Sequence, residues 1–264
     1  MEPTVSDFFG CKPPPAKGRK TNSGLLVGIE IELERVSLNR IPVGWCREKD
    51  GSLKDNGLEF TIPVWNTHAE EWLQELFSCF NHAETSPRCG IHIHANITDF
   101  TLEQLKSLIL LYIIFERPLY RFSGKRWSSN FCVPVQTWAI DLNLNEYSFT
   151  DLVHVFPKYS GINIFPEDKK RGKVLGTIEF RQMTGSKNIL YIKAWIDILS
   201  NLVKHAQKQD YEVLKHRIAD MRHTSQYWDL LKETFKDKVP ALNYSDFDED
   251  VETGITFAKL ISGN

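Results

Sequence analysis

Charged residues alternate with apolar residues in four short segments of the sequence. Side chains at every second position of a β-strand point to the same face of a sheet, so each segment would present its charges on one face and its apolar side chains on the other. The charged positions are Glu30, Glu32 and Glu34 in segment 27–34, Glu59 in 58–60, His92 and His94 in 89–95, and Glu179 and Arg181 in 176–181.

This set of side chains points to metal and phosphate chemistry. Two like charges repel by about 1 kcal/mol at 4 Å in water and by more at lower dielectric, so clustered carboxylates are favourable only where cations lie among them. Carboxylates with one or two histidines suit hard cations such as Mg²⁺ or Mn²⁺, whereas a structural Zn²⁺ site would need four Cys or His ligands. Arg181 adds a fixed positive charge that suits phosphate oxygens. A metal and an arginine together are groups that phosphoryl transfer requires.

Alternation alone is typical of any half-exposed strand, and the composition of the shared face is what distinguishes these segments. A merely solvated face would favour Lys, Thr, Ser and Gln rather than Glu, His and Arg. The sequence contains no Walker A loop, kinase glycine loop or GxSxG elbow, which disfavours those nucleotide-binding and hydrolase folds.

The elements that must position these residues alternate between strands and helices. The hydrophobic pattern predicts strands over residues 25–36, 58–62, 89–97, 159–165 and 174–183. It predicts helices over 67–80, 101–115, 151–156, 188–206, 210–220, 224–236 and 246–261, with an irregular stretch over 123–147. We therefore expect an α+β fold in which helices pack on one face of the sheet and the other face holds a polar site.

The N-terminal residues differ in composition from the rest of the chain. Residues 1–23 contain Pro13, Pro14 and Pro15 together with four basic residues. This composition predicts a flexible, solvated lead-in whose charges could also contact a phosphate. Residues 24–264 are expected to form a single catalytic domain, of which 188–264 are mostly helical.

The overall composition narrows the choice of compartment and partner. The chain has 264 residues, with 32 Lys and Arg against 34 Asp and Glu, so its net charge of −2 gives no electrostatic indication of nucleic acid or an anionic membrane. No apolar run approaches the roughly 20 residues that span a bilayer, and no signal-peptide pattern is present. The five cysteines form no CxxC pair, so we expect a reducing cytoplasm.

Five segments, taken in order, resemble the signature of the amidoligases, which belong to the carboxylate–amine ligase superfamily and are related to glutamine synthetase and glutamate–cysteine ligase. The segments are VGIEIE (27–32), DGSL (50–53), LEF (58–60), CGIHIH (89–94) and GTIEFR (176–181), and the resemblance spans about 28–186. It implies a glutamine synthetase-like catalytic fold, with the active site on the concave face of a curved antiparallel sheet. It also implies ATP and Mg²⁺ as cofactors, with Mn²⁺ as an alternative to Mg²⁺.

The resemblance further implies roles for individual residues. Metal ligands would be Glu30, Glu32, Glu59, His92 and Glu179; Glu59 is alternatively a proton acceptor for the amine, and His92 alternatively holds the substrate carboxylate. His94 would lie near the phosphates, and Arg181 would stabilise the transferring phosphoryl group. Further contacts with the nucleotide are expected from Arg121, Lys125, Arg126 and Asn163, of which Arg126 is also a candidate catalytic residue.

The activity that the resemblance implies is ATP-dependent amide formation. The γ-phosphate of ATP would pass to a carboxylate, and an amine would attack the resulting acyl phosphate. The substrates would be a small-molecule or peptide carboxylate and an amine, and the oligomeric state stays open. Three alternatives also stay open: a guanidino-kinase-like phosphotransferase of the same superfamily, an ATP-independent metal-dependent hydrolase, and a non-enzymatic module whose acidic face binds Ca²⁺ or a basic partner.

Overall fold

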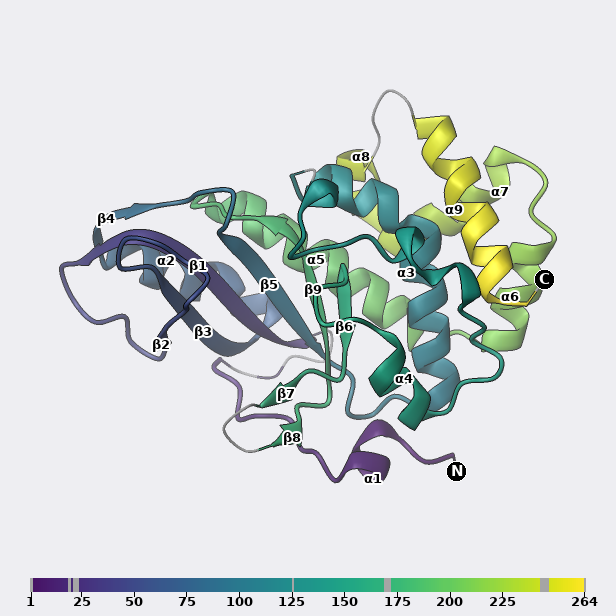
Figure 1. Ribbon diagram of the computed structural model, residues 1–264, viewed down its shortest axis with the longest axis horizontal. Helices are drawn as coiled ribbons and strands as arrows, with labels where there is room; N and C mark the ends of the chain where they lie inside the picture. The colour runs from purple at the N-terminus through teal and green to yellow at the C-terminus, as the bar shows by residue number, and fades with distance from the viewer. Residues whose placement is uncertain are drawn as a thin grey trace.

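An open antiparallel sheet of seven strands is the framework of the protein, seen here in a computed structural model (Figure 1). The structure describes residues 2–18, 20, 24–124, 126–168, 172–242 and 247–263. The sheet order is β2 (Cys46–Lys49), β3 (Leu58–Trp65), β1 (Leu26–Leu38), β5 (Gly90–Asn96), β9 (Thr177–Thr184) and β6 (Ile162–Ile164), and β4 (Phe80–Glu84) pairs with the far end of β1. Two short strands, β7 (Glu167–Asp168) and β8 (Lys173–Val174), form a separate hairpin.

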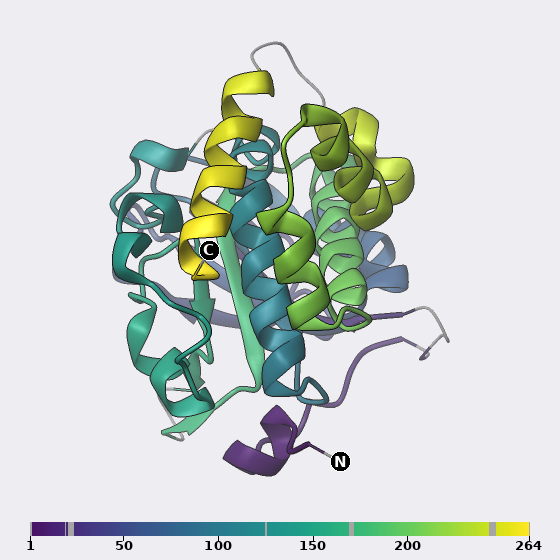
Figure 2. The same cartoon turned by 90° about the vertical axis from the view of Figure 1, so that its right-hand side faces the viewer.

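Helices accompany the sheet and form a bundle at one end of it. They are α1 (Val5–Phe9), α2 (Ala69–Ser78), α3 (Leu102–Phe122), α4 (Phe149–Val155), α5 (Ile189–Ala206), α6 (Tyr211–Ala219), α7 (Thr224–Phe235), α8 (Val239–Leu242) and α9 (Phe247–Ile261). Short 3-10 turns lie at η1 (Asn66–His68), η2 (Arg126–Ser128), η3 (Val135–Thr137), η4 (Ala139–Asp141) and η5 (Lys236–Lys238). Figure 2 shows α3 at the centre of this bundle, between α9 and α6. Among the described helices, none has the length and apolarity that crossing a bilayer requires.

One face of the sheet is apolar and is covered by helices. Ile29 and Ile31 of β1 and Ile91 and Ile93 of β5 are fully buried, and they belong to a core shared with apolar residues of α2, α3 and α5. Figure 1 shows α2 and α5 behind the strands. The predicted α+β architecture with helices on one face is therefore confirmed. The finer prediction of a concave, glutamine synthetase-like sheet stays a prediction.

Helix α3 runs about two turns beyond its predicted end, because it accommodates a proline. Pro118 has no N–H for the carbonyl of Ile114, which would normally break the ladder of hydrogen bonds at that point. The freed carbonyl instead accepts a hydrogen bond from the Tyr227 hydroxyl at 3.3 Å, and Gly254 of α9 packs directly against it. Tertiary contacts therefore compensate for the missing bond and the helix continues to Phe122.

The remaining differences from prediction concern short edge elements. Strands β2 and β4 lie where the sequence indicated loop or helix, and β3 continues past Pro63 to Trp65. Pro63 is tolerated because β2 pairs only with residues 58–61, so the strand edge at Pro63 needs no donor. The N-terminal segment contains α1, whose Thr4 forms a capping box with Asp7 and whose Val5 is fully buried.

Candidate active site

The register of the sheet places the charged side chains of neighbouring strands next to one another. Residues directly opposite in an antiparallel pair have their side chains on the same face. The opposed pairs are Glu32 with Glu59, Glu30 with His92, His94 with Glu179, and Asn163 with Glu179. The shared polar face that the alternation predicted is therefore present, opposite the helix-covered face.

A β-bulge interrupts β9 at Arg181 and Gln182. The pairing of β5 with β9 shifts between residues 91 and 93, because β9 carries one extra residue there. Arg181 turns to the polar face and forms an ion pair with Glu179. Gln182 turns to the core, where its Nε2 donates to the hydroxyl of Tyr112 at 2.5 Å. Alternation thus places Arg181 with Glu179 on the polar face, and the bulge lets Met183 face the core opposite Ile91.

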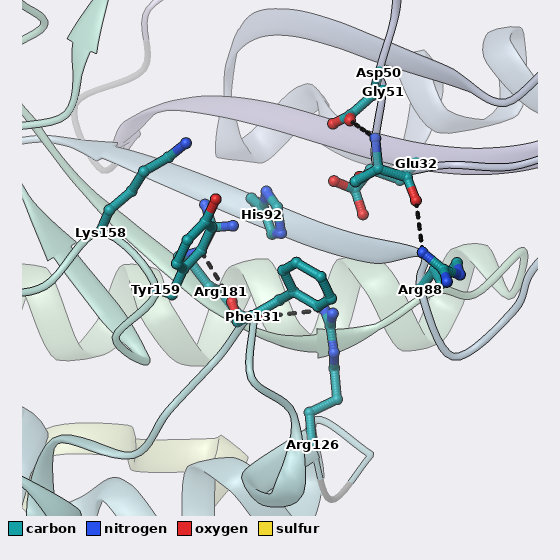
Figure 3. A pocket seen from close by; sticks show the side chains of 11 residues that line it. Glu32, Asp50, Gly51, Arg88, His92, Arg126, Phe131, Lys158, Tyr159 and Arg181 are labelled. Carbon is teal, nitrogen blue, oxygen red and sulfur yellow. Dashed lines mark hydrogen bonds between the residues drawn. The ribbon is translucent and has the colours of Figure 1, made fainter.

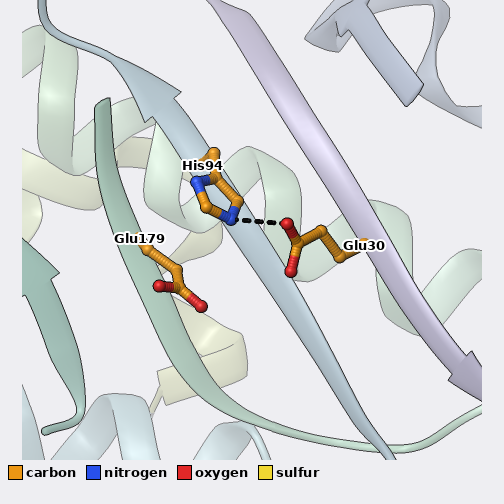
Figure 4. Close-up of side chains that lie close together, drawn as sticks. All are labelled: Glu30, His94 and Glu179. Atoms are coloured by element: carbon orange, nitrogen blue, oxygen red, sulfur yellow. Dashed lines mark ion pairs between the residues drawn. The ribbon is translucent and has the colours of Figure 1, made fainter. Parts of the chain in front are cut away.

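Glu30, His94 and Glu179 form one compact group, which we call the Glu30 cluster (Figure 4). Each offers a ligand atom within 4.8 Å of the other two. Nε2 of His94 forms an ion pair with Oε1 of Glu30 at 2.9 Å. Nδ1 of His92 approaches both carboxylates, at 3.2 Å from Glu30 and 3.4 Å from Glu179. Asn163 fixes Glu179 by donating from Nδ2 at 2.9 Å.

Glu32, Asp50 and Glu59 form a second group, the Glu32 cluster, with ligand atoms that also lie within 4.8 Å of one another. Oε2 of Glu32 accepts the backbone N–H of Gly90 at 2.6 Å, and Oδ1 of Asp50 accepts that of Ser52 at 2.7 Å. These bonds orient both carboxylates from the backbone. From the sequence, Asp50 either positions the amine or a metal-bound water, or belongs to a turn without function; the structure brings its carboxylate next to those of Glu32 and Glu59.

The electrostatics of the Glu30 cluster rest on charge compensation by histidine. Burial alone would raise the pKa of Glu30, but the charges and hydrogen bonds of His94 and His92 outweigh it and hold that pKa well below its usual range. The pKa of Glu179 is lowered in the same way, by His94 and Arg181 against burial. For His94, burial opposes the charged form, but Glu30 and Glu179 raise the pKa to about 9. His94 and Arg181 thus offset the negative charge of the two carboxylates in this cluster.

The Glu32 cluster has a surplus of negative charge. Burial and the neighbouring carboxylates of Glu30, Glu32 and Asp50 raise the pKa of Glu59 to about 8. Burial likewise raises the pKa of Glu32. Two carboxyl groups therefore resist ionisation at the same place, as expected where a cation belongs. Oxygen-rich donor sets of this kind, one of them completed by a histidine, fit Mg²⁺ or Mn²⁺.

A polar cavity of about 280 Å³ opens beside the Glu32 cluster (Figure 3). Its walls include Glu32, Asp50, Ser52, Arg88, His92, Arg126, Phe131, Lys158, Tyr159 and Arg181. Arg126 is 8% exposed and donates from Nη1 to the carbonyls of Met183 and Arg181, at 3.1 and 3.4 Å. Its buried Nε has no hydrogen-bond partner among the described residues. Neither Arg126 nor Arg88 nor Lys158 pairs with a described carboxylate, so the cavity suits an anion.

Gly90 leaves room for this convergence. A Cβ at this position would lie 2.4 Å from Nη1 of Arg126 and 2.9 Å from Nε2 of His92. Both approaches are far inside contact distance, so only glycine lets the two side chains meet beside Glu32.

A second cavity, of about 750 Å³, opens at the Glu30 end of the row and is largely apolar. Glu30 and His94 lie at its polar side. Its apolar walls come from residues 13–15 of the N-terminal segment, from Leu26 and Pro63 of the sheet, and from Val174 and Leu175. The two cavities therefore adjoin opposite ends of the same row of charged residues.

The structure gathers most of the predicted site residues and separates two. Glu34 turns away from the clusters, and its Oε1 accepts the N–H of Lys54 at 2.8 Å. Arg121 pairs with Asp250 of α9 at 2.6 Å and lines neither cavity, so it joins α3 to α9 and is not part of the site. His94, rather than His92, completes the compact cluster. Lys125 lies outside the described residues.

Arg88 and Lys158 are cavity residues that the sequence did not reveal. Both lie in loops, at the edge of β5 and after α4, where no periodic pattern reports the direction of a side chain. Figure 3 shows them on opposite sides of His92. In the sequence, Arg88 directly precedes the segment CGIHIH (89–94), and Lys158 lies five residues before Asn163. Neither position indicates by itself that the side chain lines the cavity.

Comparison with known proteins agrees with the site. A family model described as "Putative amidoligase enzyme" matches residues 57–203, which is more than half of the chain. The matched region runs from the start of β3 into α5 and includes Glu59, His92, His94, Glu179 and Arg181. No curated protein matches the chain significantly. From the extent of the family match, the chain belongs to the amidoligase family.

Proposed function

We propose that this amidoligase is an ATP- and Mg²⁺-dependent carboxylate–amine ligase that forms an amide through an acyl phosphate. One observation carries the proposal: two acidic clusters lie side by side on one face of the sheet, with Arg181 and Arg126 beside them. Acidic groups that hold divalent cations, next to fixed guanidinium groups, are what a reaction between a nucleotide and a carboxylate requires, because both reactants are anions.

The side chains would divide the first half-reaction between them. Mg²⁺ held by the Glu30 and Glu32 clusters would supply positive charge to the phosphates of ATP. Arg181 and Arg126 would reduce the repulsion between the substrate carboxylate and the γ-phosphate. A carboxylate oxygen attacks the γ-phosphorus, the bond to the bridging oxygen breaks, and ADP leaves. His92, in contact with Glu30 and Glu179, would keep these carboxylates oriented.

The second half-reaction needs a neutral amine. Burial and neighbouring carboxylates raise the pKa of Glu59 to about 8, so its ionised form is a stronger base than an ordinary carboxylate and would accept a proton from the ammonium group. The amine then attacks the acyl carbon, and inorganic phosphate leaves with the electron pair of the broken bond. If Glu59 instead ligates a cation, its pKa falls and the proton passes to another acceptor.

The proposal is tested by mass spectrometry of a reaction that contains the protein, ATP, Mg²⁺ and a mixed pool of carboxylic acids and amines. Formation of an amide together with ADP and phosphate is expected. Glu30→Gln and Glu179→Gln should both lose this activity. Glu252→Gln, an exposed substitution on α9, is the matched control and should retain it. Amide synthesis that persists in both cluster variants would contradict the proposal.

The same reaction distinguishes the alternatives. A guanidino-kinase-like phosphotransferase would yield a phosphorylated amine and ADP without free phosphate. A hydrolase would cleave a component of the pool equally well without ATP. Either product pattern would replace the ligase assignment.

A further inference from the structure

The N-terminal segment spans the edge of the sheet between two anchors. At the first, α1 docks on the loop after β5, where Val5 and Ser6 donate their N–H groups to the carbonyls of Phe100 and Thr98, both at 2.8 Å. At the second, Lys17 adds to the exposed end of β3, donating to the carbonyl of Pro63 at 2.9 Å. Residues 10–16 connect the anchors, and we call them the strap. Figure 1 shows α1 and β8 at the same end of the sheet.

The strap forms one wall of the apolar cavity. Pro13, Pro14 and Pro15 line the cavity together with Leu26, and three consecutive prolines hold such a wall extended with little conformational freedom. Thr61 belongs to the floor, because it lies directly opposite Glu30 on the polar face. The strap lies outside residues 57–203, which match the family model.

Charged side chains also line the cavity, so its ligand must carry a charged group as well as an apolar part. Lys12 of the strap and Lys173 of β8 both line it, and neither forms an ion pair with a described side chain. Glu30 and His94 of the cation-binding cluster border the same space. A ligand that fits has an apolar, ring-sized part against the prolines and an anionic part that meets two lysines and a bound cation.

The volumes of the two cavities also indicate which reactant each one can hold. Pockets for drug-sized ligands run from roughly 300 to 1,000 Å³. At about 280 Å³ the polar cavity is too small for a nucleoside with its phosphates, whereas the apolar cavity of about 750 Å³ has ample room. The polar cavity is left for a smaller, anionic reactant.

We propose that the cavity under the strap binds the nucleoside of a nucleoside triphosphate, with its phosphates directed past Lys12 and Lys173 to the Glu30 cluster. This inference rests on the proposed function for its need of a nucleotide. It adds residues 10–16, Thr61 and Lys173 as the binding wall, and it assigns the N-terminal segment a part in the site.

The test is isothermal titration calorimetry of the full chain with a non-hydrolysable ATP analogue and MgCl₂. Wild type should bind. Thr61→Trp fills the cavity from its floor and should weaken binding at least tenfold. The double variant Lys12→Glu, Lys173→Glu should weaken binding at least tenfold, and the matched control Lys208→Glu, on an exposed residue after α5, should not.

The outcomes separate this inference from the proposed function. If wild type binds no nucleotide, both fail. If wild type binds and the charge-reversed double variant binds within twofold of it, the nucleotide lies elsewhere and only the inference fails. Because Lys12 and Lys173 are exposed, that variant should keep the fold, so the result decides even if Thr61→Trp does not fold.

Discussion

Nε2 of His94 lies 2.9 Å from Oε1 of Glu30, and both side chains share a cluster with Glu179. The histidine offsets the charge of two carboxylates that come from different strands. A divalent cation at this position would replace the single positive charge of protonated His94 with a double positive charge. The pair therefore connects the sheet register directly to cation binding.

The first prediction is that divalent cations stabilise the fold. A ligand at 100 times its dissociation constant stabilises the native state by about 2.7 kcal/mol, so Mg²⁺ or Mn²⁺ should raise the unfolding temperature and a chelator should reverse the rise. Glu30→Gln and Glu179→Gln should remove the part of the rise that comes from the Glu30 cluster, while Glu252→Gln should preserve the full rise. Differential scanning calorimetry measures all four proteins. A cation-induced rise in both variants that is as large as the rise in wild type would show that no cation binds at the Glu30 cluster.

The second prediction concerns Gly90. Gly90→Ala places a methyl group 2.4 Å from Nη1 of Arg126, at the far end of a side chain that can move away. Displacing a catalytic group by about 1 Å can cost on the order of 100-fold in rate, so we expect a loss of that order in amide synthesis with the protein still folded. Gly51→Ala, whose Cβ would meet no atom within 4 Å, is the matched control. Unchanged activity of Gly90→Ala would show that amide synthesis does not depend on the close approach of Arg126 and His92 beside Glu32.

A buried network behind the site supports the third and fourth predictions. Glu116 of α3 accepts hydrogen bonds from the Tyr112 hydroxyl at 2.9 Å and from the N–H groups of Val135 and Gln136 at 2.6 and 2.8 Å. Tyr112 also accepts from Gln182, next to Arg181 in the bulge. The network thus joins the bulge to the loop that leads from Phe131, a cavity residue, into η3.

The third prediction is a pH-dependent stability that originates at Glu116. Burial raises its pKa from 4.5 to about 7, although its three hydrogen bonds and nearby Arg117 oppose the rise. Tyr112, Tyr120 and Cys132 are the other titratable groups near it, and all have raised pKa values because they are buried. Only Glu116 therefore titrates between about pH 5 and pH 7 in this network.

The sign follows from the raised pKa. The native state holds the Glu116 proton more tightly than the unfolded state, so the contribution is complete below pH 4.5 and is lost as pH rises through about 7. The free energy of unfolding of wild type, relative to Glu116→Gln, should fall by on the order of 3 kcal/mol over this range. Urea unfolding at pH 4.5 to 8 measures it. A difference between the two proteins that does not vary with pH would contradict the prediction.

The fourth prediction is that Tyr112→Phe destabilises the fold. It removes one donor to Glu116 and leaves Nε2 of the buried Gln182 without its partner. A buried polar group without a partner costs about 1–3 kcal/mol, so urea unfolding should show a loss of that size. The control is Tyr147→Phe, since no described residue forms a hydrogen bond with the Tyr147 hydroxyl. Equal stability of the two variants would show that the network contributes nothing.

The sequence predicted the polar face well because strand periodicity is a local property. Alternation fixed which of Glu30, Ile31 and Glu32 point together, and the register then aligned them with β3 and β5. The order of the motifs also led to the correct family. Nothing in this inference required knowledge of loops.

What the sequence could not predict depends on contacts between distant segments. The bulge that turns Met183 to the core arises from the pairing of β5 with β9, not from the local pattern. Asp50 and Lys158 reach the site from loops, whose course no periodicity encodes. Arg121 has the right charge and lies near the right motif, but Asp250, 129 residues further along the chain, holds it elsewhere.

The most direct test of the central claim is anomalous X-ray diffraction from crystals grown with Mn²⁺ and a non-hydrolysable ATP analogue. We predict one Mn²⁺ peak bound by Glu30, His94 and Glu179, and a second bound by Glu32, Asp50 and Glu59. Manganese bound to the nucleotide elsewhere, with no peak at either cluster, would contradict the claim that this face of the sheet is a cation-dependent active site.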